Sequence, residues 1–141
     1  MNPDTPANSD RGNRRIVPAA SKYAYDNFHF AAAVIDGANL RMSGVIGTGP
    51  DGRPAAEPET QFRQAFEAAA VVLTEAGLDF ADVTDITSYH IGLQTHMAEF
   101  IAVKDRFVSA PYPAWTAVGT TELAIPGALV EIQIIARISD S

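Results

Sequence analysis

The sequence predicts an α+β domain whose β-sheet has one face covered by helices. Three observations support this fold class. The pair Asp36-Gly37 separates two apolar stretches, which is a typical hairpin signal because both residues tolerate a positive φ. Residues 60–76 repeat apolar side chains at helical spacing. Residues 129–138 alternate as a strand does when one of its faces is buried.

The N-terminal part of the chain predicts a tail followed by the hairpin. Residues 1–16 are rich in Asn, Asp, Pro and Arg and poor in apolar residues, so we expect a flexible N-terminal tail. Residues 17–141 are expected to form one domain, since 141 residues suggest a single domain. The two hairpin strands are expected at 28–35 and 38–46.

The middle of the chain predicts two helices with a strand between them. The helix at 60–76 ends naturally at Gly77. A third strand is expected at 86–93. Thr95 is suited to cap a second helix over 96–108.

The last two strands are expected at 115–118 and 129–138, and the final strand has two different faces. One face is apolar and should pack under the helices; it holds Val130, Ile132, Ile134, Ala136 and Ile138. The other face is mixed and holds Leu129, Glu131, Gln133, Ile135 and Arg137. A half-apolar face of this kind indicates an interface between subunits.

Composition excludes several classes of function. The formal net charge of -7 opposes binding to nucleic acid, whose affinity depends on neutralising phosphates. The absence of cysteine rules out disulfides and thiolate metal sites, and the three histidines have spacings that match no usual metal site. No apolar run has the length of a membrane span, and the N-terminus lacks the apolar centre of a signal peptide. We therefore expect a cytoplasmic protein without metal.

Several motifs, in order along the chain, resemble those of one family. The C-terminal stretches 113–119 (PAWTAVG) and 126–136 (PGALVEIQIIA) are similar to the C-terminal signature of the YjgF/Rid family of reactive-intermediate deaminases. The stretches 40–46 (LRMSGVI), 61–66 (QFRQAF) and 76–83 (AGLDFADV) resemble further family motifs in the same order and spacing. The resemblance covers nearly everything from about Phe28 to Ile138.

The resemblance implies the architecture and the assembly. It implies a chorismate-mutase-like fold in which a mixed β-sheet carries two helices on one face, with the element order β-β-α-β-α-β-β. In the family, three such sheets close into a barrel-like homotrimer, and a ligand cleft lies between each pair of subunits.

The resemblance also assigns site residues position by position. Phe30 falls where the family has a pocket tyrosine, and Gly44 matches the glycine whose N–H helps to hold the substrate carboxylate. Trp115 replaces the arginine that grips this carboxylate, and Ala117 matches a small residue, often cysteine, two positions later. These four are the expected substrate-binding residues. Glu131 matches the glutamate that orients the attacking water and is an expected catalytic residue.

His90 is a second candidate for a catalytic role. It lies in the third predicted strand, and a histidine near a cleft can act as acid or base at neutral pH. The alternative is that it lies at an interface and bonds to backbone. Arg41 and Arg137 could replace the missing arginine from other strands, although surface or ion-pair roles fit them better.

These residues predict a reaction and leave two alternatives. Imine hydrolysis needs a held substrate, a protonated nitrogen and an aimed water, which Glu131 can orient and deprotonate. Trp115 offers a flat apolar surface that fits a bulkier, aromatic or less charged substrate. The sequence thus predicts a cofactor-free hydrolytic deaminase of reactive imines or enamines with an altered substrate preference. The alternatives are a non-catalytic trimer that binds a small metabolite, and a ribonuclease, which the acidic balance disfavours.

Overall fold

The computed structural model of the chain describes residues 14–138. The strands of this part form one mixed sheet in the order β1-β2-β3-β6-β4-β5, in which β4 and β5 run parallel and every other neighbouring pair runs antiparallel. The expected α+β class with a mixed sheet is confirmed. The strands are β1 (Arg14–Ile16), β2 (Ala33–Asp36), β3 (Asn39–Met42), β4 (Val83–His90), β5 (Ala114–Gly119) and β6 (Val130–Arg137).

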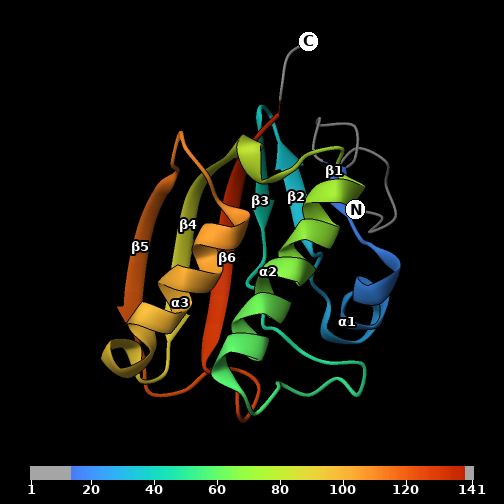
Figure 1. Cartoon of the computed structure of the whole chain (residues 1–141). Helices are drawn as coiled ribbons and strands as arrows, with labels where there is room; N and C mark the ends of the chain where they lie inside the picture. The colour runs from blue at the N-terminus through green and yellow to red at the C-terminus, as the bar shows by residue number, and fades with distance from the viewer. Residues whose placement is uncertain (1–13, 139–141) are drawn as a thin grey trace.

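Two long helices cover one face of the sheet. Figure 1 shows α2 and α3 lying next to each other over this face, whereas the short α1 lies at the end of the molecule near β1 and β2. The predicted order β-β-α-β-α-β-β corresponds to the chain from β2 to β6. The helices are α1 (Lys22–Phe28), α2 (Pro58–Glu75) and α3 (Leu93–Phe107), with short 3-10 turns η2 (Ala19–Ser21) and η3 (Phe80–Asp82).

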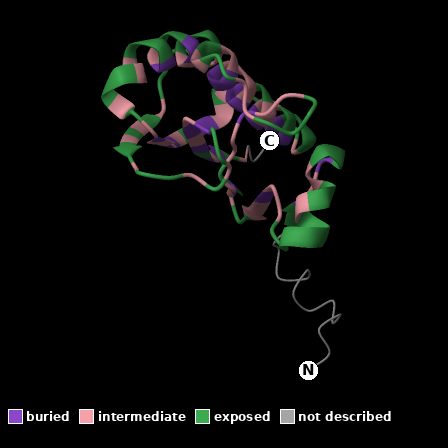
Figure 2. Cartoon of the chain, turned by 90° about the horizontal axis from the view of Figure 1, so that it is seen from below, coloured by how far each residue is buried: buried purple, intermediate pink, exposed green. Residues whose placement is uncertain are grey.

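The core lies between the two helices and the sheet, where Figure 2 shows the buried residues gathered. Phe62 and Phe66 of α2 pack against Phe100 of α3, with ring centroids 5.4 and 5.6 Å apart. Each fully buried side chain of this size contributes roughly 1.5–3 kcal/mol to folding. The apolar face predicted for the last strand is confirmed, since these side chains of β6 are fully buried: Val130, Ile132, Ile134 and Ala136.

The hairpin is confirmed, but its first strand is shorter than expected. Asp36 pairs with Asn39, and Gly37 between them has φ +62°. The strand begins only at Ala33, because α1 precedes it and ends where His29 adopts a left-handed conformation with φ 63°. Periodicity could not reveal α1, because none of its residues is buried.

The expected N-terminal tail is also too long by at least three residues. Arg14–Ile16 form β1 and pair with β2, and the side chain of Ile16 is buried in the core. This burial explains why the segment is ordered despite its two arginines. The remainder of the expected tail lies outside the described residues.

The second long helix begins earlier than the sequence predicts. Helix α3 starts at Leu93, directly after Gly92, which has φ 67° and occupies the N-cap position. Thr95 therefore lies within the helix and does not cap it, and β4 ends at His90 instead of continuing to 93. Glycine takes this left-handed conformation without steric cost, which allows the abrupt strand-to-helix turn.

Candidate functional site

The two faces of the sheet have different environments. Along β6, Ile132 and Ile134 point into the core, while Glu131 and Gln133 point to the face that no helix of the described chain covers. The register places Tyr89 of β4 opposite Glu131. The two side chains therefore share the open face, in agreement with the period of two along each strand.

Glu131 packs against Gly44, which lies in the loop after β3. Val45 forms an antiparallel bridge with Ile132, with N–O distances of 2.8 and 2.9 Å, and this bridge fixes the loop beside β6. A Cβ atom on Gly44 would lie 2.6 Å from Cδ and 2.9 Å from Cγ of Glu131. Only glycine leaves room for the carboxylate in this position.

The peptide of Gly44 is accessible as well as close to the carboxylate. The residue is exposed, and among the described residues no backbone carbonyl accepts a hydrogen bond from its N–H. An open N–H donor and a carboxylate therefore lie side by side. A donor of this kind can bind an anionic or carbonyl oxygen, and the carboxylate can accept a proton.

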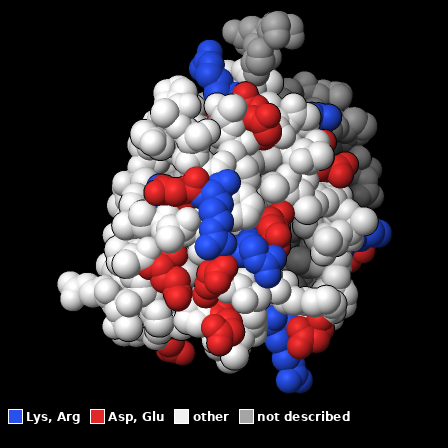
Figure 3. Space-filling view, in the orientation of Figure 1, with Lys and Arg blue, Asp and Glu red and all other residues white. Residues whose placement is uncertain are grey.

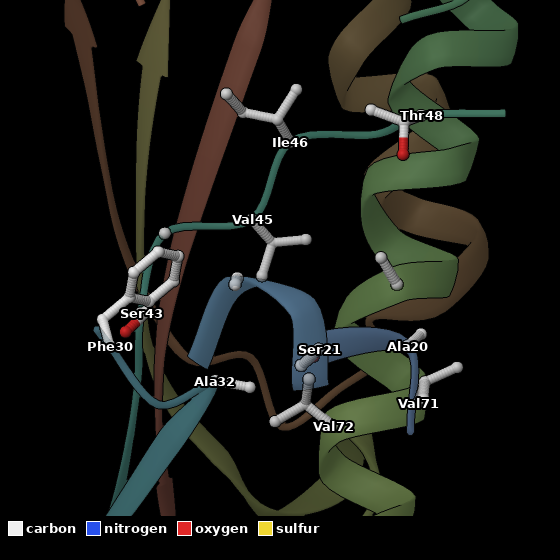
Figure 4. A pocket seen from close by; sticks show the side chains of 13 residues that line it. Ala20, Ser21, Phe30, Ala32, Ser43, Val45, Ile46, Thr48, Val71 and Val72 are labelled. Carbon is white, nitrogen blue, oxygen red and sulfur yellow. The ribbon is translucent and has the colours of Figure 1, made fainter. Parts of the chain in front are cut away.

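A pocket of about 290 Å³ begins beside this pair. Figure 4 shows it between α1, α2 and the loop after β3. Phe30 and Gly44 both line the pocket, together with Val71 and Val72 of α2. The hydroxyl of Ser43 donates to the carbonyl of Ala31 over 2.7 Å and so ties the loop to the segment that carries Phe30. Gly44 thus has two of the expected site residues as neighbours: Phe30, which lines the same pocket, and Glu131, whose carboxylate it contacts.

The other expected site residues form a second cluster under α3. His90 and Ser88 are buried on the helix-covered face of β4, and His90 Nε2 lies 2.7 Å from Ser88 Oγ. Trp115 of the neighbouring strand donates its indole N–H to the same hydroxyl over 2.9 Å. Ala117 is the Cα partner of Ser88 in β5. His90 also meets the ring of Phe100 edge-on, with centroids 4.7 Å apart.

The electrostatic environment keeps His90 neutral. Burial lowers its pKa from the ordinary value of 6.5, and the nearby His96 lowers the pKa further. The Nδ1 atom of His90 is buried without a hydrogen-bond partner among the described residues. Lys104 completes the cluster, since its ammonium lies 5.0 Å from the ring centroid of Trp115 and forms an ion pair with Asp105.

His90 and Glu131 therefore lie on opposite faces of the sheet. The register pairs His90 with Val130 and Tyr89 with Glu131, so the two expected catalytic side chains cannot share a substrate within one chain. Because His90 is only 1% exposed, its placement favours a structural role over the expected acid–base role. The indole N–H of Trp115 is likewise already bonded to Ser88 and does not point to Glu131.

The two arginines that could replace the missing family arginine lie on neighbouring strands, Arg41 on β3 and Arg137 on β6. Arg41 pairs with Ile135, and Arg137 pairs with Asn39. Among residues 14–138, neither arginine forms an ion pair. These pairs place both arginines towards the C-terminal end of β6, whereas Glu131 lies near its N-terminal end.

Ser88 was not predicted as part of the site, although its signal is present in the sequence. Residues two positions apart in a strand share a face, so a hydroxyl at 88 and an imidazole at 90 must lie together. What the sequence could not reveal is that Trp115, which is 27 positions away, joins this pair across a parallel strand.

Within 14–138 there is no group of three or more histidine or acidic side chains that could hold a metal ion. In the same part of the chain, no helix is both long and apolar enough to cross a membrane.

Comparison with known proteins identifies relatives along most of the chain. Residues 23–138 match the family model Ribonuc_L-PSP, described as Endoribonuclease L-PSP. The RutC family protein YjgH of Escherichia coli (strain K12) is 38% identical over 126 residues, which cover 89% of this chain and 95% of the relative. A solved structure of protein YJGH has a TM-score of 0.82 at 35% identity and covers 92% of this chain and 98% of its own.

Two further solved structures are similar. Rv2704 of Mycobacterium tuberculosis, a member of the YjgF/YER057c/UK114 family, has a TM-score of 0.75 at 25% identity and covers 89% of this chain and 99% of its own. E. coli TdcF with bound serine has a TM-score of 0.72 at 26% identity and covers 78% of this chain and 88% of its own.

Proposed function

Because this chain belongs to the YjgF/Rid family, we propose that it hydrolyses reactive imine or enamine intermediates to a carbonyl compound and ammonia. The observation that carries the proposal is the contact between the Glu131 carboxylate and the exposed peptide of Gly44. This arrangement supplies one group that can activate water and one that can hold the substrate.

In the proposed reaction, water bound to Glu131 attacks the carbon of a protonated C=N bond. Glu131 takes the proton of the water, a step that contributes typically 10²–10⁴-fold to the rate. The N–H of Gly44 holds an oxygen of the substrate. Glu131 then returns its proton to the nitrogen of the tetrahedral adduct, the C–N bond breaks with its electron pair on nitrogen, and the hydroxyl gives its proton to Glu131 as the carbonyl forms and ammonia leaves. An enamine enters the same route after protonation on carbon gives its imine form.

We propose that the working form is a homotrimer with one cleft between each pair of subunits. The open face of the sheet supports this, because it leaves Val118 exposed and Ile135 only half-buried in the single chain. Strand β5 is an edge strand that carries Trp115 and Ala117 far from Gly44 in the sheet order. In the trimer, the β5 edge of one subunit would complete the cleft at Gly44 of its neighbour.

The substrate preference is proposed to differ from that of arginine-containing relatives. TdcF was solved with bound serine, a small and charged ligand. In the present chain, a tryptophan whose N–H is already bonded to Ser88 stands at the position of the arginine. Without a bidentate cation for a carboxylate, we propose that binding energy comes from apolar contact instead.

The second candidate is a trimer that binds a small metabolite and does not convert it. The engaged Trp115 N–H favours this candidate, because the residue contributes no free donor to a ligand. A ribonuclease, as the family model's description suggests, is disfavoured. The net charge is -7, and Figure 3 shows basic and acidic side chains interspersed over the helix-covered face instead of a basic patch.

The test is an imine-hydrolysis assay with wild type and Trp115→Arg. An amino-acid oxidase generates imines from small, aliphatic and aromatic amino acids, and the surviving imine is trapped chemically. We expect wild type to accelerate hydrolysis of bulky imines and Trp115→Arg to shift the preference toward small ones. If wild type accelerates none while a metabolite raises its thermal stability, the binding function replaces the deaminase.

A further inference from the structure

We propose that the pocket between α1 and α2 is a side-chain subsite that selects substrates bearing an uncharged apolar group of about phenyl size. This inference rests on the proposed function, because it assigns the substrate class of the same site. Apart from Gly44, the pocket is lined by residues that do not belong to the Glu131–Gly44 pair.

The hollow exists because small side chains face one another across it. Ala20 and Ala24, in η2 and α1, lie opposite Ala68 of α2, and Figure 4 shows the valine side chains of α2 turned toward the same space. None of the residues of α1 is buried, so this helix does not fill the gap itself.

The size of the pocket fits a ring. Its volume is about 290 Å³. An engineered apolar cavity of about 150 Å³ binds benzene, so a phenyl or branched aliphatic group fits here with room for its connecting carbon. A substrate with only a methyl group would leave most of the pocket to water and gain little from it.

The chemistry of the lining excludes charge. Of the residues that the structure describes, no acidic or basic one lines the pocket, and its polar side chains are the hydroxyls of Ser21, Ser43 and Thr48. The Ser43 hydroxyl is already bonded to the carbonyl of Ala31. A carboxylate or ammonium entering this space would lose its hydration without gaining a counter-ion, which is strongly unfavourable.

Gly44 connects the subsite to the proposed reaction centre. It lines the pocket, and its Cα faces the carboxylate of Glu131. A substrate group in the pocket therefore reaches the peptide of Gly44, the residue that the pocket shares with the Glu131 contact. Phe30 gives the entrance an aromatic wall where relatives are expected to have a tyrosine.

The test fills the pocket with Ala68→Phe and uses Ala70→Phe, on the same helix but outside the pocket, as the matched control. The kcat/KM values are compared for imines made from phenylalanine, alanine and glutamate. We expect wild type to prefer the phenylalanine-derived imine over the glutamate-derived imine by at least about 10-fold. Ala68→Phe should lower the ratio of the phenylalanine to the alanine value by at least about 10-fold, and Ala70→Phe should keep it.

A second measurement separates this inference from the proposed function. Phenylpyruvate, the hydrolysis product of the phenylalanine-derived imine, and pyruvate are titrated into each variant by calorimetry. Tight phenylpyruvate binding that is lost only in Ala68→Phe supports the subsite even if no imine is hydrolysed, in which case the deaminase fails alone. Equal phenylpyruvate affinity in Ala68→Phe and wild type, or equal rates with the phenylalanine- and glutamate-derived imines, overturns the subsite.

Discussion

At the scale of single residues, the site depends on the absence of a side chain at Gly44. The glycine leaves the space into which the Glu131 carboxylate reaches, and a Cβ at this position would displace that carboxylate. The sequence resemblance indicated both residues. Their direct contact, and the exposed N–H beside it, became visible only when the Val45–Ile132 bridge placed the loop against β6.

A second residue-scale feature is the hydroxyl of Ser88, which links His90 to Trp115. The Oγ atom of Ser88 lies within hydrogen-bond distance of His90 Nε2 in β4 and of Trp115 Nε1 in β5. We infer that this link fixes the position of β5 under α3 and keeps the tryptophan from turning outward. It also makes the protonation state of His90 important for folding.

The buried His90 predicts a loss of stability on mild acidification. Its pKa is lowered in the folded state by burial and by His96, so below about pH 6.5 the unfolded chain takes up a proton that the folded chain excludes. The contribution of neutral His90 to the free energy of unfolding is therefore fully present above pH 6.5. It decreases as the pH falls from 6.5 toward the pKa of His90 in the folded state. Urea unfolding at pH 7.5 and 5.5 should show this decline in wild type and a smaller decline in His90→Gln.

The matched control for this measurement is His29→Asn. His29 is exposed and left-handed, a conformation that asparagine tolerates. A decline that persists unchanged in His90→Gln, or that disappears in His29→Asn, would assign the acid sensitivity to another group.

At the scale of elements, Gln61 connects α2 to the loop before β6. It is fully buried, and its amide donates to the carbonyls of Ala55 and Gly127 while its oxygen accepts from the N–H of Leu129. One side chain thus holds two loops and the start of the strand that carries Glu131. The helix periodicity identifies this face of α2, but it does not reveal that a polar residue within it has these partners.

Replacing Gln61 with leucine should destabilise the fold by at least about 2 kcal/mol, because buried backbone groups would lose their partners. Gln64→Leu, one turn along the same helix, is the contrasting control. Within residues 14–138 the buried Oε1 atom of Gln64 has no hydrogen-bond partner, so its replacement should be nearly neutral. Chemical denaturation of the two variants measures the difference, and equal losses would show that the Gln61 bonds contribute nothing specific.

The elements that the sequence predicted are those with a strong local signal. The hairpin turn at Asp36-Gly37, the apolar stripe of α2 and the alternating face of β6 all have one. The segments that were missed lack such a signal. Helix α1 has no buried residue, and β1 contributes only Ile16 to the core. Helix α3 begins after Gly92, and a glycine in a sequence is as typical of a loop as of a helix end.

At the scale of the whole molecule, the expected site residues lie in two separate regions of the sheet. Gly44 and Glu131 lie together, but Trp115 and Ala117 lie on the far edge strand. The period of two along a strand predicts which face carries each residue, but it does not reveal which strands are neighbours or which subunit completes the site. Association that brings the β5 edge of one subunit to Gly44 of its neighbour is the proposed way in which the two regions meet.

The proposed trimer predicts that a charge on the open face disrupts assembly. Wild type should have three times the 15.0 kDa mass of the chain in light scattering coupled to size exclusion. Ile135→Glu would bury a carboxylate in the interface and should shift the protein to monomer while preserving its circular dichroism. Thr74→Glu, on the exposed side of α2, should remain trimeric, and a monomeric wild type would refute the assembly.

The most direct test of the central claim is the rate of imine hydrolysis by Glu131→Gln beside Gln133→Ala. Glutamine keeps the shape of Glu131 but cannot take a proton, and Gln133 is the next residue on the same open face. We expect Glu131→Gln to lose about 10²–10⁴-fold in kcat for phenylalanine-derived imine and Gln133→Ala to stay near wild type. Full activity in Glu131→Gln, with the fold intact, would contradict the account.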